Sequence, residues 1–321
     1  MATGEDLVTH LRRFLVLIVA ACVAFAAGIA LGGGPLQGES ADRTADLTAQ
    51  RDALESRVDA LDRARVIDEA VAAAAAPRLL AGRLEGRTIT VLTLPGTDEE
   101  SVSQLRSTLR AAGGSVAVSA ALSPDLIDPA KKTYVDSVAT NSVSGEPGLA
   151  EIVTGETYDR IGALIARAYV GTQDNTTLDE TATLVDSELE GARLVQVEGE
   201  PGRRGSLAVL VGPAPDDDAA TLEAQRLILT SISRALVRSS DGFVLIQPEG
   251  AGSAESLAAT MRADEELGAD RSWSAVNVDE GAAAHLTGAY ALAAASAGNG
   301  GVFGVQAGTA SLPPGLTPPT D

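Results

Sequence analysis

The stretch that decides the fold is Thr88–Ala121, TITVLTLPGTDEESVSQLRSTLRAAGGSVAVSAA. Its first seven residues are rich in β-branched side chains and end at Pro95-Gly96, which is typical of a buried strand. Leucine and valine then recur at helical spacing from Thr97 to Ala112. Two glycines follow, and Ser115–Ala121 has the composition of a second strand. The strand–helix–strand order predicts parallel strands in one sheet with helices on its faces.

The same alternation of strands and helices returns after a long, polar and largely helical segment, residues 124–191. We expect strands at Leu207–Val211, Phe243–Ile246, Ser274–Val278 and Val302–Val305, and helices at Asp218–Ser239, Ser253–Leu267 and Gly281–Ala297. These elements predict an α/β domain over residues 82–308 with a Rossmann- or flavodoxin-like parallel sheet. The proline-rich tail, residues 309–321, is predicted to be disordered.

The N-terminal region carries a candidate membrane anchor. Phe14–Leu31, FLVLIVAACVAFAAGIAL, is uncharged and would reach about 27 Å as a helix, enough to cross the hydrocarbon core. Arg12 and Arg13 directly precede it, which predicts that residues 1–13 are cytoplasmic and the chain after the span lies outside. The alternative is a cleaved signal peptide, since Ala24–Ala26 has the small-x-small form of a cleavage site. We favour a single-pass anchor in the cell membrane, because the apolar run continues past that site.

A glycine-rich joint, residues 32–40, and a long helix, residues 41–76, follow the anchor, and Pro77 is expected to end the helix. Leucines recur every seven residues along this helix, as the d positions of a coiled coil do. The a positions are less apolar, so a coiled-coil stalk and a single helix packed on the following domain both stay open. The apolar positions and the charges beside them are the candidate partner-binding residues: Leu47, Leu54, Arg57, Val58, Leu61 and Asp62.

The composition excludes several classes of function. The chain has 24 Lys and Arg against 44 Asp and Glu, a net charge of −20, and such an acidic protein repels nucleic acid. A single cysteine, Cys22, rules out a disulfide scaffold. Two histidines and two methionines leave few ligands for a transition metal. We therefore expect no nucleic-acid partner, and the residues alone assign no metal ligands.

The motifs that carry chemistry in α/β proteins are not matched. The first strand-to-helix turn, LPGTDEE at residues 94–100, has one glycine where a dinucleotide-binding turn has three. Its carboxylates would repel a phosphate, and Thr97 and Glu100 have the spacing of a helix capping box. No G-x-S-x-G elbow is present, and His285 is the only histidine beyond the anchor. We expect no catalytic residues, no cofactor and no enzyme.

Two stretches, RDALESRVDALDR at 51–63 and GRTITVLTLPGTDEESVSQLRSTLRAAGGSVAVSAALSPDLIDP at 86–129, carry a resemblance. In these stretches and in its order of anchor, short coiled coil and α/β domain, the chain resembles the actinobacterial family of copper transport outer membrane proteins. The resemblance implies a pore-forming envelope protein for copper efflux or homeostasis.

It also implies a link to cell separation, with a cell-separation factor or a peptidoglycan hydrolase as partner, and it supplies no ligand residue. The residues themselves favour a different mode of action. A membrane-anchored interaction module, paired as a homodimer or higher homo-oligomer through the stalk, fits them better than a pore, because the anchor has no polar stripe to line one.

Overall fold

The central feature of the protein is an eight-stranded sheet. The computed structural model describes residues 35–199, 201–215, 218–248, 256–278, 281–306 and 309–316. The chain divides into two compact units, residues 1–67 and 68–321, and the sheet belongs to the second. Its strands are β1 Thr88–Thr93, β2 Ser115–Leu122, β3 Val195–Val197, β4 Leu207–Val211, β5 Gly242–Ile246, β6 Trp273–Asn277, β7 Val302–Gln306 and β8 Thr309–Ser311.

The strand order confirms the predicted parallel-dominated α/β sheet. The strands lie in the order β3-β2-β1-β4-β5-β6-β7-β8, and all neighbours from β2 to β7 pair in parallel. The two edge strands, β3 and β8, pair antiparallel with their neighbours. Apart from the direction of β3, the first six strands follow the order of a doubly wound Rossmann sheet. The chain leaves β1 and β4 in opposite directions along the sheet, so these two neighbours form its topological switch point.

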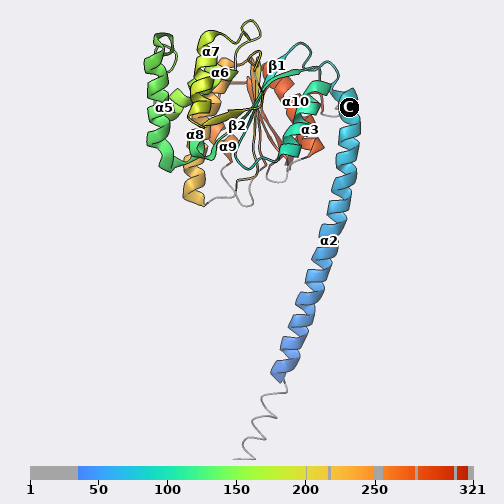
Figure 1. Ribbon diagram of the computed structural model, residues 1–321. Coiled ribbons are helices and arrows are strands. Elements are labelled where there is room, and N and C mark those ends of the chain that lie inside the picture. Colours follow the sequence, from blue (N-terminus) through green and yellow to red (C-terminus); the bar gives the residue numbers. More distant parts are fainter. Residues whose placement is uncertain are drawn as a thin grey trace, which may run out of the picture. The chain divides into compact units, whose positions relative to one another are not determined.

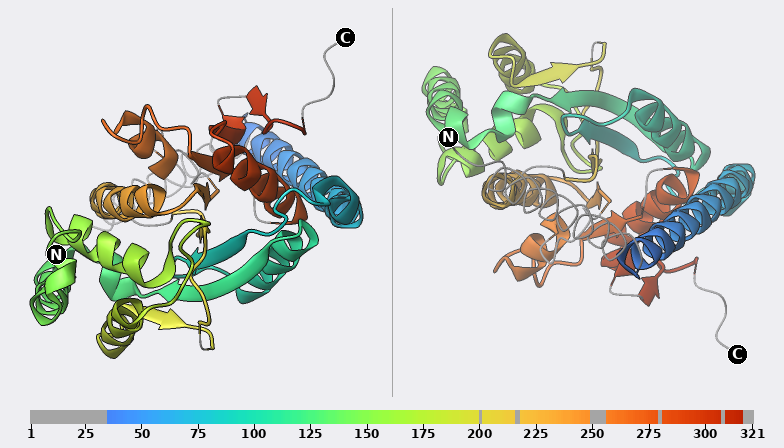
Figure 2. Two further views of the ribbon diagram at one scale, coloured as in Figure 1. Left: turned by 90° about the horizontal axis from the view of Figure 1, so that it is seen from above. Right: turned by 90° about the horizontal axis from the view of Figure 1, so that it is seen from below.

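Helices cover both faces of the sheet (Figure 1). One face carries α3 (Glu99–Ala111) and α10 (Ala282–Ser296). The other carries α6 (Thr157–Tyr169), α8 (Ala219–Ser239) and α9 (Leu257–Ala263), with α4 (Pro124–Ile127), α5 (Lys132–Gly145) and α7 (Glu180–Gly191) packed around them. The views from above and below show the same two layers on opposite sides of the strands (Figure 2).

The sheet separates two hydrophobic cores. Successive side chains of β1 point to opposite faces, so that Val91 joins the core under α3 and α10 while Leu92 joins the core under α6 and α8. Phe243 of β5 and Trp273 of β6 are buried in the second core. Trp273 is the only tryptophan in the chain. Its indole Nε1 donates to the carbonyl of Leu267 at 2.8 Å, so the polar atom of this buried ring has a partner.

Helix α9 is shorter than the sequence predicts. The expected helix ran from Ser253 to Leu267, but α9 ends at Ala263 and residues 253–255 lie outside the described residues. Asp264 ends it because its carboxylate accepts the backbone N–H groups of Glu266 and Leu267, both at 3.1 Å. A short polar side chain thus takes the hydrogen bonds that a further helical turn would have used.

The tail is ordered where the sequence predicts disorder. Residues 309–311 form β8, which pairs with β7. Leu316 packs against the core under α3 and α10, and its N–H donates to the carbonyl of Pro313 at 3.1 Å. The prediction of disorder is therefore wrong for residues 309–316, because composition alone does not register an apolar side chain that reaches a core. Residues 317–321 lie outside the described residues.

The long helix α2 (Pro35–Leu80) also departs from its predicted limits. It begins within the predicted glycine-rich joint and continues through Pro77 instead of ending there. Proline removes one helical hydrogen bond, but Ala76 and Leu80 on either side are buried in the core of the second unit. That burial holds the last turn helical, so both predicted boundaries are wrong.

The predicted cytoplasmic segment (residues 1–13) and anchor (residues 14–31) lie outside the described residues. Among the helices that the structure does describe, none combines the length and the apolar character needed to cross a bilayer. The single-pass topology therefore stays a prediction.

Candidate functional site

The six predicted partner-binding residues all lie on α2 within the first unit. Leu47, Leu54, Val58 and Leu61 are between 55% and 66% exposed. At 100° per residue, these four positions fall within a narrow arc of the helix surface. Arg57 and Asp62 are exposed on its flanks. The structure thus gathers the predicted residues into one stripe, here called the leucine stripe, that the described part of the chain leaves open to solvent.

Within the second unit, the last turns of α2 pack beside α10 (Figure 2). The hydroxyl of Tyr290 on α10 donates to the carbonyl of Leu79 at 2.7 Å. The guanidinium of Arg83 stands 4.3 Å from the centre of the Tyr290 ring, a cation–π contact. The carboxyl end of α2 is therefore fastened to the domain by apolar and polar contacts together.

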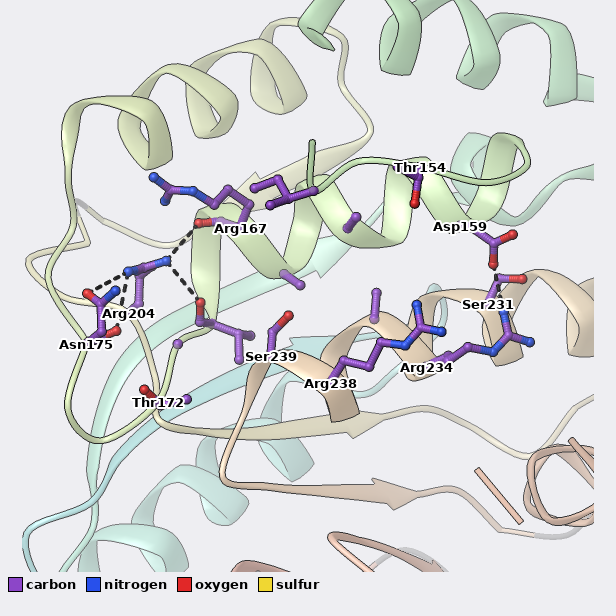
Figure 3. A pocket seen from close by; sticks show the side chains of 16 residues that line it. Thr154, Asp159, Arg167, Thr172, Asn175, Arg204, Ser231, Arg234, Arg238 and Ser239 are labelled. Atoms are coloured by element: carbon purple, nitrogen blue, oxygen red, sulfur yellow. Dashed lines mark hydrogen bonds and ion pairs between the residues drawn. The ribbon is translucent and has the colours of Figure 1, made fainter. Parts of the chain in front are cut away.

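A cavity of about 440 Å³ opens between α6 and α8 and contains four arginines (Figure 3). Its cations are Arg167, Arg204, Arg234 and Arg238. Three of the four are neutralised by carboxylates: Arg167 by Asp179 at 2.6 Å, Arg234 by Asp159 at 2.7 Å and Asp264 at 2.6 Å, and Arg238 by Glu266. These ion pairs tie helices and loops together and neutralise the three charges, although Nη1 of Arg167 is buried without a hydrogen-bond partner among the described residues.

Within the part of the chain that the structure describes, Arg204 is the cation of this cavity that makes no ion pair with a carboxylate. It is 5% exposed, and its Nε donates to the carbonyl of Thr177 at 2.9 Å. Its terminal nitrogens donate to the carbonyls of Arg167 and Val170 at the end of α6, and to Asn175 (Figure 3). Burial lowers the pKa of Arg204. These contacts cap the carboxyl end of α6 and close the loop after it, which is a structural role.

A second cavity, of about 390 Å³, lies at the carboxyl edge of the sheet and is here called the switch-point crevice. Leu94 and Pro95 at the end of β1 face Pro213 after β4 across it. In open parallel sheets ligands bind outside the carboxyl ends of the strands, at the switch point. The position of the crevice in the fold is therefore typical of a ligand site. Its other lining residues are Pro124, Ile127, Asp128, Pro129, Ala214, Pro215, Thr221, Gln225, Leu229 and Gln247.

The acidic turn after β1 caps α3, but through a different residue from the one predicted. Asp98 is the N-cap, and its carboxylate accepts the N–H of Ser101 at 2.8 Å. The hydroxyl of Thr97 instead donates to the carbonyl of Leu94 at 2.6 Å, so the predicted capping box of Thr97 and Glu100 is wrong. The aspartate one residue later competes better for the helical N–H groups. Another aspartate, Asp218, caps α8 in the same way.

The two soft metal ligands of the described domain are buried and stand apart. Met261 on α9 belongs to the core on one face of the sheet. His285 lies on α10, which covers the opposite face, and it is 2% exposed. No group of three His, Cys, Asp or Glu side chains that could hold a metal occurs among the residues that the structure describes. The fold therefore does not bring Met261 and His285 into one copper site.

His285 forms a polar pair with Ser101, whose hydroxyl oxygen stands 3.1 Å from the imidazole Nε2. Burial lowers the pKa of His285 to about 4, against a smaller opposite effect of Glu69. The imidazole is then neutral at pH 7 and a weak base, whereas a general base works best with a pKa near the working pH. The pair is a partly buried hydrogen bond between α3 and α10, which fits a structural role for His285.

Sequence reasoning missed the switch-point crevice. A signal was present, since Pro95 and Pro213 come one and two residues after two strands that the sequence predicts to be parallel. The sequence does not show, however, that these two strands are neighbours in the sheet. The sequence carries no signal for the capping role of Arg204. Its acceptors are backbone carbonyls between residues 167 and 177, and every residue type has such a carbonyl.

The comparison with known families covers nearly the whole chain. Residues 9–314 match the family described as copper transport outer membrane protein, MctB. No curated protein shows a significant match to the chain. The matched range includes the leucine stripe, the eight-stranded sheet and the switch-point crevice together. The chain therefore belongs to the copper transport outer membrane protein (MctB) family, whose members are copper transport-related proteins of the cell envelope.

Proposed function

We propose that this envelope protein works as a non-enzymatic interaction module, and that two copies pair in parallel through α2. The observation that carries the proposal is the leucine stripe. Three leucines seven residues apart, with Val58 between two of them, are exposed on a 46-residue helix. Covering such a row with another helix is favourable, because each leucine side chain gains about 2 kcal/mol on burial.

Charge placement supports a second copy of the chain as the covering helix, with both copies parallel. Arg57 and Asp62 flank the stripe as g and e positions five residues apart, the spacing at which opposite charges meet across a parallel pair. Arg51 occupies an a position, where two like charges would repel. Its Nε stands 3.1 Å from Glu55 of the same helix, which offsets that charge.

The finer roles of the family are part of the same proposal. The apolar run at residues 14–31 supports a single-pass anchor, and anchored copies would leave one membrane side by side, as a parallel pair requires. The resemblance to proteins linked to cell separation supports an envelope partner, such as a cell-separation factor or a peptidoglycan hydrolase. We propose that the partner binds the dimer after it has formed, because the second copy of the chain would already cover the leucine stripe.

Cysteine cross-linking tests the parallel pair. In a full chain with Cys22 changed to serine, Leu54→Cys is expected to form a disulfide between copies in high yield under mild oxidation. Position d faces d of the partner only in a parallel, in-register pair. The yield is read as the dimer band on a non-reducing gel.

Ser56→Cys is the matched control, because it lies on the same turn but faces away from the stripe. The proposal requires a clear excess of the Leu54→Cys dimer over the Ser56→Cys dimer. Equal yields at both positions would show random collision. An absence of dimer at Leu54→Cys would contradict the parallel pair, and the leucine stripe would then bind something other than a second copy.

Copper transport, the role in the family description, is a second candidate function. We propose that the domain supports copper handling through assembly in the envelope and not through tight binding. The separation of Met261 and His285 by the sheet supports this view. We expect the full chain to bind copper weakly through carboxylates, as it would other divalent ions.

The expected copper result is that Met261→Leu and His285→Gln leave the affinity unchanged. Both replacements keep the side-chain volume while they remove the soft ligand. Titration of the full chain with Cu(I) and Cu(II) in a competing chelator measures the affinity. A submicromolar affinity that falls tenfold or more in either variant would contradict the prediction and restore direct copper binding.

A further inference from the structure

The switch-point crevice lies where a doubly wound sheet offers room for a ligand. Leu94 and Pro95 leave β1 toward α3, on one face, while Pro213 leaves β4 toward α8, on the other. The two chain segments part at this point and leave a cavity of about 390 Å³. That volume is in the range of small-molecule sites.

The hydrogen-bonding groups of the crevice are mostly acceptors. Five of its thirteen described lining residues are prolines, which have no backbone N–H. Two of its side-chain donors already have partners: Gln247 Nε2 donates to the carbonyl of Pro213 at 3.1 Å, and the hydroxyl of Thr221 donates to Asp218 at 2.7 Å. The amide oxygen of Gln247 is an acceptor. The crevice therefore suits a ligand that brings its own donors.

The charge of the crevice has one sign. Among its described lining residues, Asp128 is the only charged group, and no lysine or arginine lines it. One carboxylate oxygen of Asp128 accepts the N–H of Ala130 at 2.9 Å, which fixes the side chain. This is the reverse of a nucleotide site, where glycine N–H groups and a helix N-terminus hold a pyrophosphate. An anion is disfavoured here, and a cation is favoured.

We propose that the switch-point crevice binds an organic cation, an ammonium or guanidinium group on a short apolar stem. The cationic head pairs with the Asp128 carboxylate and donates to the amide oxygen of Gln247. The stem packs on Leu94, Ile127 and the proline rings. The same chemistry is found in a free alkylamine and in a lysine or arginine side chain of a peptide. Self-pairing through α2 is not required, since the crevice is built entirely from the second unit.

Calorimetric titration of the full chain in a neutral detergent tests the proposal. The probes are n-butylguanidinium and n-butylammonium, with butyrate as the anion of equal length. We expect the cations to bind with a dissociation constant of about 1 mM, as befits small ligands, and butyrate not to bind. Asp128→Asn keeps the oxygen that accepts from Ala130 and removes the charge, so it should weaken cation binding at least tenfold.

Two further variants make the test specific. Ala214→Phe fills the crevice and should abolish binding, while the fluorescence of Trp273 confirms that the domain is folded. Asp125→Asn removes a nearby carboxylate outside the crevice and should leave the affinity unchanged. A Gly-Arg-Gly peptide that binds more tightly than butylguanidinium identifies a peptide-borne side chain, and weaker binding identifies a free amine. Equal binding of butyrate, an equal loss in Asp125→Asn, or no cation binding overturns the proposal.

Discussion

Changing Leu54 and Leu61 together to aspartate is expected to abolish self-association of the full chain. Both side chains are 62% exposed on α2, so the change costs the single helix little. In a parallel pair it removes four leucines from the seam, at about 2 kcal/mol each, and places like charges opposite one another. Since every 1.4 kcal/mol is a factor of ten, we expect the dimer to weaken by at least about 1000-fold. Sedimentation velocity in detergent measures the effect.

Val66→Asp is the matched control for this double variant. Val66 is also on α2 and is 66% exposed, but it lies off the leucine stripe. It should keep the dimer, and circular dichroism should be unchanged in both proteins. In a deletion strain, the double variant should show the same envelope or cell-separation defect as the strain without the gene. If the double variant still self-associates and complements the deletion strain, the leucine stripe is not the interface between the two copies.

Arg204→Met is expected to destabilise the domain by about 3 kcal/mol. The change removes a buried guanidinium and leaves the carbonyls of residues 167, 170, 175 and 177 without their donor. Hydrogen bonds to a charged group contribute about 1.5–3 kcal/mol each, and release of a desolvated charge offsets part of their loss. Urea unfolding of the full chain, followed by the fluorescence of Trp273, reports the free energy.

The neighbouring Arg203→Met serves as the comparison. Arg203 is exposed, and its described side-chain bond is to the hydroxyl of Thr176 at 2.9 Å. Its loss should cost less than about 1 kcal/mol. Arg204→Lys keeps the charge but cannot reach both sides of the loop, so it should fall between the two methionine variants. A stability of Arg204→Met within 0.5 kcal/mol of the parent (about the error of such a measurement) would show that water replaces the guanidinium.

The parallel strands were predictable because a buried strand has a local pattern, a short apolar run between polar or turn residues. Leu207–Val211 is apolar throughout and is bounded by polar or turn residues, and β4 has these limits. The edge strands β3 and β8 were not foreseen, since each has only three residues and depends on a neighbour for its hydrogen bonds. Short edge strands lack a pattern long enough to recognise.

The candidate sites divide in the same way. The leucine stripe follows from spacing along one helix, so the sequence predicted its six residues, and the structure shows that the apolar ones are exposed. The switch-point crevice joins segments more than 100 residues apart, such as Pro95 and Pro213. No local pattern reports which strands become neighbours. Cavities of this kind are visible only once the strand order is known.

The two short edge strands have a consequence for how copies of the protein meet one another. A long parallel edge would offer unpaired N–H and C=O groups on which strands of other molecules could add without limit. Here β3 and β8 each present only three residues at the two borders of the sheet, and both run against the direction of their neighbours. Such short edges offer few hydrogen bonds to an added strand, so pairing of copies edge to edge is disfavoured.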